Sequence, residues 1–214
     1  MDLLSFKEFS TQYVSYFTER IRGLSVMDIE PVVQELLKAR MHGSNIFLIG
    51  NGGSASIASH FAQDLSSIGT TKADLPAALF DGIKAQLALA PVPFRPFRAL
   101  SLTDNFSTIS ALGNDHGYEH IFTGQLKRYY HPGDMLIAIS SSGNSLNIVN
   151  AVKFVKKHGG TTVGIVGFSG GAIKRLCDHC IFVNADKGAY GPVESLHLAL
   201  MHLIRDYLKV NLER

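Results

Sequence analysis

Hydrophobic positions along the chain change from a helical period to short unbroken runs, and the two patterns then alternate to the end. Apolar side chains at helical spacing over 3–22 and 27–42 predict two N-terminal helices. The short apolar runs that follow are typical of strands buried on both faces of a sheet. We expect strands at these runs: 45–50, 99–103, 135–139, 161–168 and 181–183.

Segments with helical periodicity separate several of these strands. They lie at 54–68, 117–128, 145–158 and 171–177, and a last long one covers about 192–212. Strands that alternate with helices predict an α/β protein with a parallel, doubly wound sheet and right-handed crossovers. Segment 70–98 departs from the pattern, because four prolines surround a helix-like stretch there. A connection of that length usually serves a function.

Composition excludes several classes of protein. Hydrophobic residues make up 46% of the 214 residues and charged residues 18%, which predicts a folded chain with a sizeable core. A net charge of +2 gives no indication that the partner is a nucleic acid or an anionic membrane. The apolar runs are too short to cross a bilayer, and the first residues do not resemble a signal peptide. We therefore expect a soluble, cytoplasmic enzyme or small-molecule binder.

Two loops rich in Gly, Asn and Ser each follow a predicted strand and lead into a predicted helix. They are Gly-Asn-Gly-Gly-Ser at 50–54 and Ser-Ser-Ser-Gly-Asn-Ser at 140–145. Glycines allow a close approach of the backbone, helix N-termini favour anions, and hydroxyls add neutral donors. Neither loop has the lysine of an ATP-binding loop or the glycine spacing of a dinucleotide site, so no nucleotide cofactor is expected. A small phosphate monoester suits them better; two ordinary turns with serine caps are the alternative.

Histidines and carboxylates form a second set of candidates. His60 and Asp64 are four residues apart on the helix after the first loop, so they share a face. Glu194, His197 and His202 lie in the first half of the last helix. Such groups serve as metal ligands or as an acid–base pair, although a solvated or hydrogen-bonded role stays open for each histidine. Glu194 and His202 would be about 12 Å apart along one straight helix, so a shared site needs Glu194 at or before its start.

Cys177 and Cys180 form a Cys-x-x-Cys motif. The chain has no second such pair for a zinc ribbon, and the motif falls where a helix runs into a strand. Reactive cysteines prefer a helix N-terminus. We interpret this pair as structural.

In their order along the chain, these motifs resemble the sugar isomerase (SIS) domain family and, within it, the phosphoheptose isomerases. The motifs that carry the resemblance are 50–54, His60-Phe61-Ala62, Gly113-Asn114-Asp115, 139–145 and the histidines His197 and His202. The resemblance implies a five-stranded parallel doubly wound sheet of flavodoxin type, flanked by helices, with an N-terminal helical hairpin. It also implies a single domain over 1–214, in which the helices of 1–42 serve oligomerisation and 45–214 form the α/β core.

The resemblance further implies an aldose–ketose isomerase. Members of this family convert sedoheptulose 7-phosphate to D-glycero-D-manno-heptose 7-phosphate by enediol proton transfer, for lipopolysaccharide, capsule or other heptose glycans. They are homotetramers whose neighbouring subunits complete the active sites. The alternative is a non-catalytic member that binds a phosphosugar or acts in replication initiation. Such members tend to lose the acid–base pair, whereas both positions are filled here.

Residue roles follow from the resemblance, position by position. Asp64 and His202 take the catalytic positions. One zinc ion per site is implied on four side chains: His60, Asp64, Glu194 and His202. Contacts to the sugar phosphate are implied for a larger set: Asn51, Gly52, Gly53, Ser54, Asp115, Ser140, Ser141, Ser142, Ser145 and Glu194.

Five features depart from the family pattern. Asp64 is one methylene shorter than the usual glutamate, which could misplace a catalytic carboxylate. Glu194 replaces a glutamine, and its charge suits a metal. Gly191 stands in place of an aspartate and Ile68 in place of an arginine, while 79–98 resembles an insertion beside the site.

Overall fold

The computed structural model describes residues 5–69 and 95–212, so most of the predicted insertion at 79–98 lies outside the described residues. Five parallel strands form one sheet in the order β2-β1-β3-β4-β5. The strands are β1 (Asn45–Ile49), β2 (Arg98–Ser101), β3 (Met135–Ser140), β4 (Thr161–Val166) and β5 (His179–Phe182). This confirms the predicted sheet. In sheets of this type, ligands bind where the winding reverses, beyond the carboxyl ends of β1 and β3.

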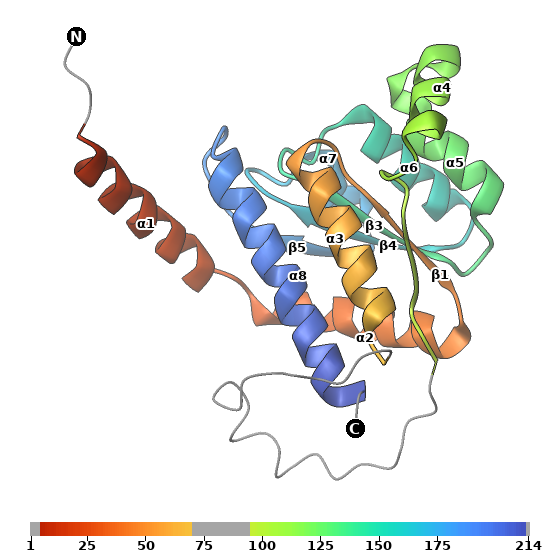
Figure 1. Cartoon of the computed structure of the whole chain (residues 1–214), viewed down its shortest axis with the longest axis horizontal. Helices are drawn as coiled ribbons and strands as arrows, with labels where there is room; N and C mark the ends of the chain where they lie inside the picture. The colour runs from red at the N-terminus through yellow and green to blue at the C-terminus, as the bar shows by residue number, and fades with distance from the viewer. Residues whose placement is uncertain (1–4, 70–94, 213–214) are drawn as a thin grey trace.

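Helices cover both faces of the sheet (Figure 1). One layer holds α2 (Val26–His42), α3 (Gly53–Ser67) and α8 (Tyr190–Leu212). The other holds α4 (Phe106–His116), the 3-10 helix η3 (Tyr118–His120), α5 (Ile121–Tyr129), α6 (Leu146–Lys157) and α7 (Gly171–Leu176). Successive strand residues pack into opposite layers, because side chains alternate along a strand. Ile46 and Leu48 of β1 enter the first core, and Phe47 and Ile49 the second.

Helix α4 was not predicted, and the predicted helix 117–128 begins later than expected. Gly117 has a φ of +92°, which separates α4 from the elements that follow. The side chain of Asn105 accepts a hydrogen bond from the backbone N–H of Thr108 and so caps α4. Leu112 is the single buried residue of α4, so this helix has no apolar stripe that periodicity could detect.

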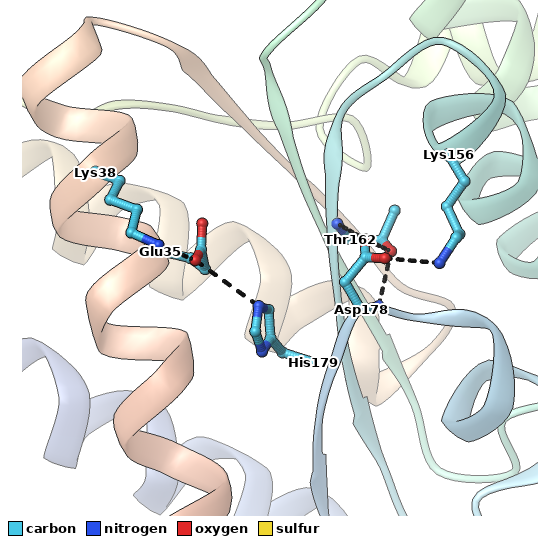
Figure 2. Close-up of polar contacts among 6 residues, drawn as sticks. All are labelled: Glu35, Lys38, Lys156, Thr162, Asp178 and His179. Carbon is cyan, nitrogen blue, oxygen red and sulfur yellow. Dashed lines mark hydrogen bonds and ion pairs between the residues drawn. The ribbon is translucent and has the colours of Figure 1, made fainter.

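Two polar clusters fix β5 and its neighbours at the edge of the sheet (Figure 2). Asp178 accepts hydrogen bonds from the backbone N–H and the hydroxyl of Thr162 at 2.9 and 2.7 Å, and Lys156 donates to it at 2.6 Å. Burial raises the pKa of Asp178, but these hydrogen bonds outweigh burial and hold the pKa below its usual value. On the other side, Glu35 of α2 lies 3.8 Å from Nε2 of His179.

Helix α1 (Phe6–Arg22) points away from the body of the molecule (Figure 1), and none of its residues is buried. It contacts the segment before α8 through two side chains. The hydroxyl of Tyr16 accepts a hydrogen bond from the backbone N–H of Asp186 at 2.8 Å, and Arg20 lies 3.8 Å from the Asp186 carboxylate. No helix in the described part of the chain has the length and apolar character required to cross a lipid bilayer.

Candidate active site

A cavity of about 120 Å³ lies between the start of α3 and the start of α6. It occupies the position that the strand order favours, beyond β1 and β3. Most of the side chains predicted to bind the sugar phosphate line it: Asn51, Ser54, Ser140, Ser141, Ser142, Ser145 and Glu194, together with Ile139 and Tyr190. Among the described residues its lining contains no lysine or arginine, so the donors that it offers an anion are neutral: hydroxyls, backbone N–H groups and the amide of Asn51.

The serine hydroxyls of the second loop are left with hydrogens to donate. The hydroxyl oxygens of Ser140 and Ser142 accept backbone N–H groups at 3.1 and 3.3 Å, which leaves their own hydrogens for a ligand. The hydroxyl of Ser141 is buried and has no hydrogen-bond partner in the part of the chain that the structure describes. Ser145 precedes α6 and makes no capping bond with its side chain. A buried hydroxyl in a cavity wall is available to a ligand or a water molecule.

Glycine is required where this loop meets the turn before α7. Gly143 has a φ of +65°, and a Cβ built on it would lie 2.0 Å from the carbonyl oxygen of Gly170. On the other side of the cavity, a Cβ on Gly50 would lie 2.3 Å from the carbonyl oxygen of Ser54. Any side chain at Gly143 or Gly50 would therefore displace the loop that supplies the donors.

His60, Asp64 and His202 come together from two helices. Nε2 of His60 lies 3.0 Å from Nε2 of His202, and the Asp64 carboxylate lies 3.3 and 3.9 Å from these two nitrogens. The two imidazoles are 50% and 46% exposed, so the group is open to solvent and to a ligand. The two predicted catalytic side chains, Asp64 and His202, therefore lie next to each other where α3 packs against α8.

The donor chemistry of this group fits a divalent metal ion. One ligand atom from each of the three residues lies within 4.8 Å of the others, and Oδ2 of Asp64 is buried with no hydrogen-bond partner among the described residues. When neither Nε2 carries a hydrogen, each imidazole offers a lone pair close to the Asp64 carboxylate. Two imidazoles and a carboxylate are ligands that zinc accepts.

Glu194 is not part of this group. Its Oε2 lies 2.1 Å from the position that a Cβ on Gly53 would occupy, so its carboxylate rests over the first turn of α3. A carboxylate at a helix N-terminus is stabilised by the helix dipole. Glu194 therefore belongs to the wall of the cavity, as predicted for substrate contact, and its role as a fourth metal ligand stays a prediction.

Asp115, Ile68 and Gly191 are not among the described residues that line the cavity. Asp115 is exposed near the end of α4, and its carboxylate accepts a hydrogen bond from Asn114. It does not line the cavity, so its sugar contact stays a prediction. Ile68 is 2% exposed in the core, and a Cβ on Gly191 would make ordinary contact with the Tyr13 hydroxyl at 3.4 Å.

Sequence reasoning missed four side chains around the site. Tyr190 lines the cavity, and Arg205 lies 4.0 Å from Asp64. Asn147 and Tyr118 hydrogen-bond to Asn51. The spacing of three residues between His202 and Arg205, which places them on one helix face, was a signal that could have identified Arg205.

Burial shifts the pKa of three further groups, the fully buried His197 and the partly buried Cys177 and Cys180. His197 is fully buried, and burial lowers its pKa to about 4, although the nearby carbonyl of Val166 favours the protonated ring. Burial raises the pKa of Cys177 to about 12 and that of Cys180 to about 11. Thiols with such pKa values are poor nucleophiles, which supports the structural interpretation of the motif.

Comparisons with known proteins identify the relatives of this chain. The SIS domain family matches residues 99–203. A phosphoheptose isomerase from Akkermansia muciniphila is 33% identical over 199 residues, which cover 92% of this chain and 93% of that protein. The chain belongs to the phosphoheptose isomerase family. The resemblance stated from the motifs is confirmed.

Two other members of the phosphoheptose isomerase family extend the comparison. One from Aneurinibacillus thermoaerophilus is 37% identical over 177 residues, which cover 82% of this chain and 77% of that protein. The solved phosphoheptose isomerase of Neisseria gonorrhoeae aligns with a TM-score of 0.78 at 24% identity, over 96% of this chain and all of that one. At that identity the structural likeness shows the fold.

Proposed function

We propose that this chain is an isomerase that converts sedoheptulose 7-phosphate to D-glycero-D-manno-heptose 7-phosphate. Family membership supports the type of reaction, because relatives that match most of the chain are phosphoheptose isomerases. The cavity wall of hydroxyls and helix N-termini supports a phosphate as one end of the substrate. The group of His60, Asp64 and His202 supports proton transfer at the other end.

The observation that carries this proposal is the spacing of the two parts along α3 and α8. These helices lie side by side and run in the same direction (Figure 1), with Gly53 opposite Glu194 and His60 opposite His202. At a rise of 1.5 Å per residue, the histidines lie about 11 Å beyond the cavity along the helices. That separation suits an extended seven-carbon chain that carries its phosphate at one end and reacts at the other.

Isomerisation requires proton movements at two carbons and two oxygens. A proton leaves C1 of the ketose and one is delivered to C2, while the C1 hydroxyl loses a proton and the C2 oxygen gains one. Asp64 and His202 are the side chains that would accept and donate these protons, since a carboxylate and an imidazole can do both near neutral pH. The cavity at the start of α3 and α6 would orient the substrate by binding its phosphate, far from the reacting carbons.

We also propose that His60, Asp64 and His202 hold one zinc ion per site. When bound, the ion would supply positive charge beside the enediolate oxygens. Asp64 and His202 would then be ligands, so the metal-bound group and the free acid–base pair are alternative uses of the same side chains. A chelator separates the two uses.

The test is conversion of sedoheptulose 7-phosphate in D₂O, followed by NMR. The wild-type chain should form the aldose with solvent deuterium at C2. Asp64→Asn and His202→Ala should each lower turnover by about 10²–10⁴-fold, the usual contribution of an acid or base. His42→Ala, which removes an exposed imidazole at the end of α2, is the matched control and should keep full turnover.

Each outcome of this test is informative. Activity lost on chelation and restored by zinc supports the metal site, whereas activity that survives chelation removes zinc from the reaction. Full turnover by Asp64→Asn and His202→Ala would refute the assigned roles. No conversion by the wild-type chain, with phosphate still bound, would favour the non-catalytic alternative.

Assembly as a homotetramer with shared sites is part of the proposal, with 1–42 as the assembly region and 45–214 as the core. Phe6 and Val14 of α1 are 81% and 62% exposed, so this helix presents apolar surface to a partner. An apolar groove of about 300 Å³ between α2 and α8 offers a second such surface. Light scattering should give four times the monomer mass; a monomer would refute this part. A cytoplasmic location and a role in heptose glycans are likewise proposed.

A further inference from the structure

Asn51, in the wall of the cavity, is held by two side chains from other elements. It forms a reciprocal pair with Asn147, in which each Nδ2 donates to the other Oδ1 at 2.9 Å. The hydroxyl of Tyr118 donates to the same Oδ1 of Asn51 at 3.1 Å. Asn147 is 2% exposed in the first turn of α6, and Tyr118 begins η3. The loop after β1, α6 and η3 therefore meet in one side-chain network.

The backbone of α6 determines which way both amides face. The N–H of Ile148 donates to Oδ1 of Asn147 at 3.0 Å. A backbone N–H can only donate, so this bond fixes the position of Oδ1 and leaves Nδ2 of Asn147 to face Asn51. Asn51 must then present its own Oδ1 to that donor and its Nδ2 to Oδ1 of Asn147. Tyr118 meets the same oxygen of Asn51 and so donates to it.

This network leaves Asn51 with a single unused group. Its Oδ1 has two acceptor positions, and both are filled by Asn147 and Tyr118. One of its two Nδ2 hydrogens is donated to Asn147. Within the described residues, the remaining N–H is the only polar group of the Asn51 side chain without a hydrogen-bond partner, so it can contact a ligand.

We propose that Asn147 and Tyr118 are positioning residues that make Asn51 a one-hydrogen donor, so that this wall of the site selects an oxygen acceptor of the sugar. That acceptor is a carbonyl oxygen or a hydroxyl lone pair next to the phosphorylated end. The identity of the sugar rests on the proposed function. The orientation of Asn51 does not, because it follows from the hydrogen bonds within the chain.

The test compares binding of two probes, sedoheptulose 7-phosphate and inorganic phosphate, by calorimetry. Asn147→Ala frees Asn51 to rotate, so affinity for the sugar phosphate should fall about tenfold, the value of one well-placed hydrogen bond. Affinity for inorganic phosphate should change less than twofold, because the serine loop is untouched. Tyr118→Phe removes one donor to Asn51 and should have a smaller effect of the same kind. Asn211→Ala, which removes an amide near the end of α8, is the control and should bind both probes normally.

Two further measurements separate positioning from general damage. In Asn147→Ala, KM for the sugar phosphate should rise more than kcat falls. By NMR of the free wild-type chain, one Asn51 Nδ2 proton should exchange slowly and the other quickly, and both should exchange quickly in Asn147→Ala.

The proposal is overturned if Asn147→Ala binds both probes normally, or weakens both equally. It is also overturned if the two Asn51 amide protons exchange alike in the wild-type chain. If the wild-type chain binds the sugar phosphate no better than inorganic phosphate, the proposed function fails. The exchange measurement then still decides the inference about Asn51.

Discussion

His197 should make the stability of this protein depend on pH in the mildly acidic range. Its imidazole is fully buried and neither ring nitrogen has a hydrogen bond of ordinary geometry, so burial disfavours the charged ring. The pKa falls from 6.5 in the unfolded chain to about 4 in the folded one. Between these values the unfolded chain binds more protons, so the free energy of unfolding falls as the pH falls.

The size of the effect follows from the same two pKa values. A shift from 6.5 to about 4 corresponds to about 3 kcal/mol over the whole range. About 2 kcal/mol of this should be lost between pH 7.5 and pH 5, because most of the titration of the unfolded imidazole is complete by then. His197→Leu replaces the titrating imidazole with an apolar side chain, so the variant should lack this part of the pH dependence.

Denaturation by guanidinium chloride at fixed protein concentration, from pH 5 to pH 7.5, gives the required free energies. The quantity of interest is the difference between wild type and His197→Leu, because every other titrating group cancels in it. His42→Ala, at the exposed end of α2, should show the same pH dependence of the free energy of unfolding as the wild type. Parallel curves for wild type and His197→Leu would refute the reasoning, since the histidine would then titrate alike in both states.

Three other predictions concern the loops, the metal site and the thiols. Gly143→Ala should lower the free energy of unfolding, measured by urea denaturation, by about 2–3 kcal/mol and should weaken phosphate binding, because overpacking adds to backbone strain. Gly133 has a φ of +90° with open space around it, so Gly133→Ala should show the effect of backbone strain alone. Wild-type protein dialysed against zinc should retain about one ion per chain by mass spectrometry, and His60→Ala should retain none; equal retention would contradict the site. Cys177 and Cys180 should react with a thiol reagent only after unfolding, so rapid labelling of the native protein would contradict their raised pKa values.

The sheet and the two Gly- and Ser-rich loops could be predicted because their signals are local. Five apolar runs became five strands, and both Gly- and Ser-rich loops lie beyond the strands that precede them. The pair of His60 and Asp64 follows from helical spacing alone. The contact of these residues with His202 depends on the packing of α3 against α8. That contact was predicted from the resemblance to a family and not from spacing.

The parts that were missed depend on side chains from distant segments. The network around Asn51 joins a loop, a helix and a 3-10 helix, and no spacing in the sequence connects them. Helix α4 has no apolar stripe, because one residue of it is buried. The position of Glu194 depends on how closely α8 approaches Gly53, where glycine leaves room for a carboxylate.

The order of strands has a consequence for the synthesis of the chain. β1 lies between β2 and β3, and these neighbours begin only at Arg98 and Met135. At translation rates of about 5–20 residues per second, the apolar β1 would wait several seconds on the ribosome with both edges unpaired. Non-local parallel pairing is also slow to form once the partners are present. Newly made chains are therefore exposed to aggregation through β1 until β3 has emerged, and slower synthesis at low temperature or a chaperone that covers this strand should raise the yield of folded protein.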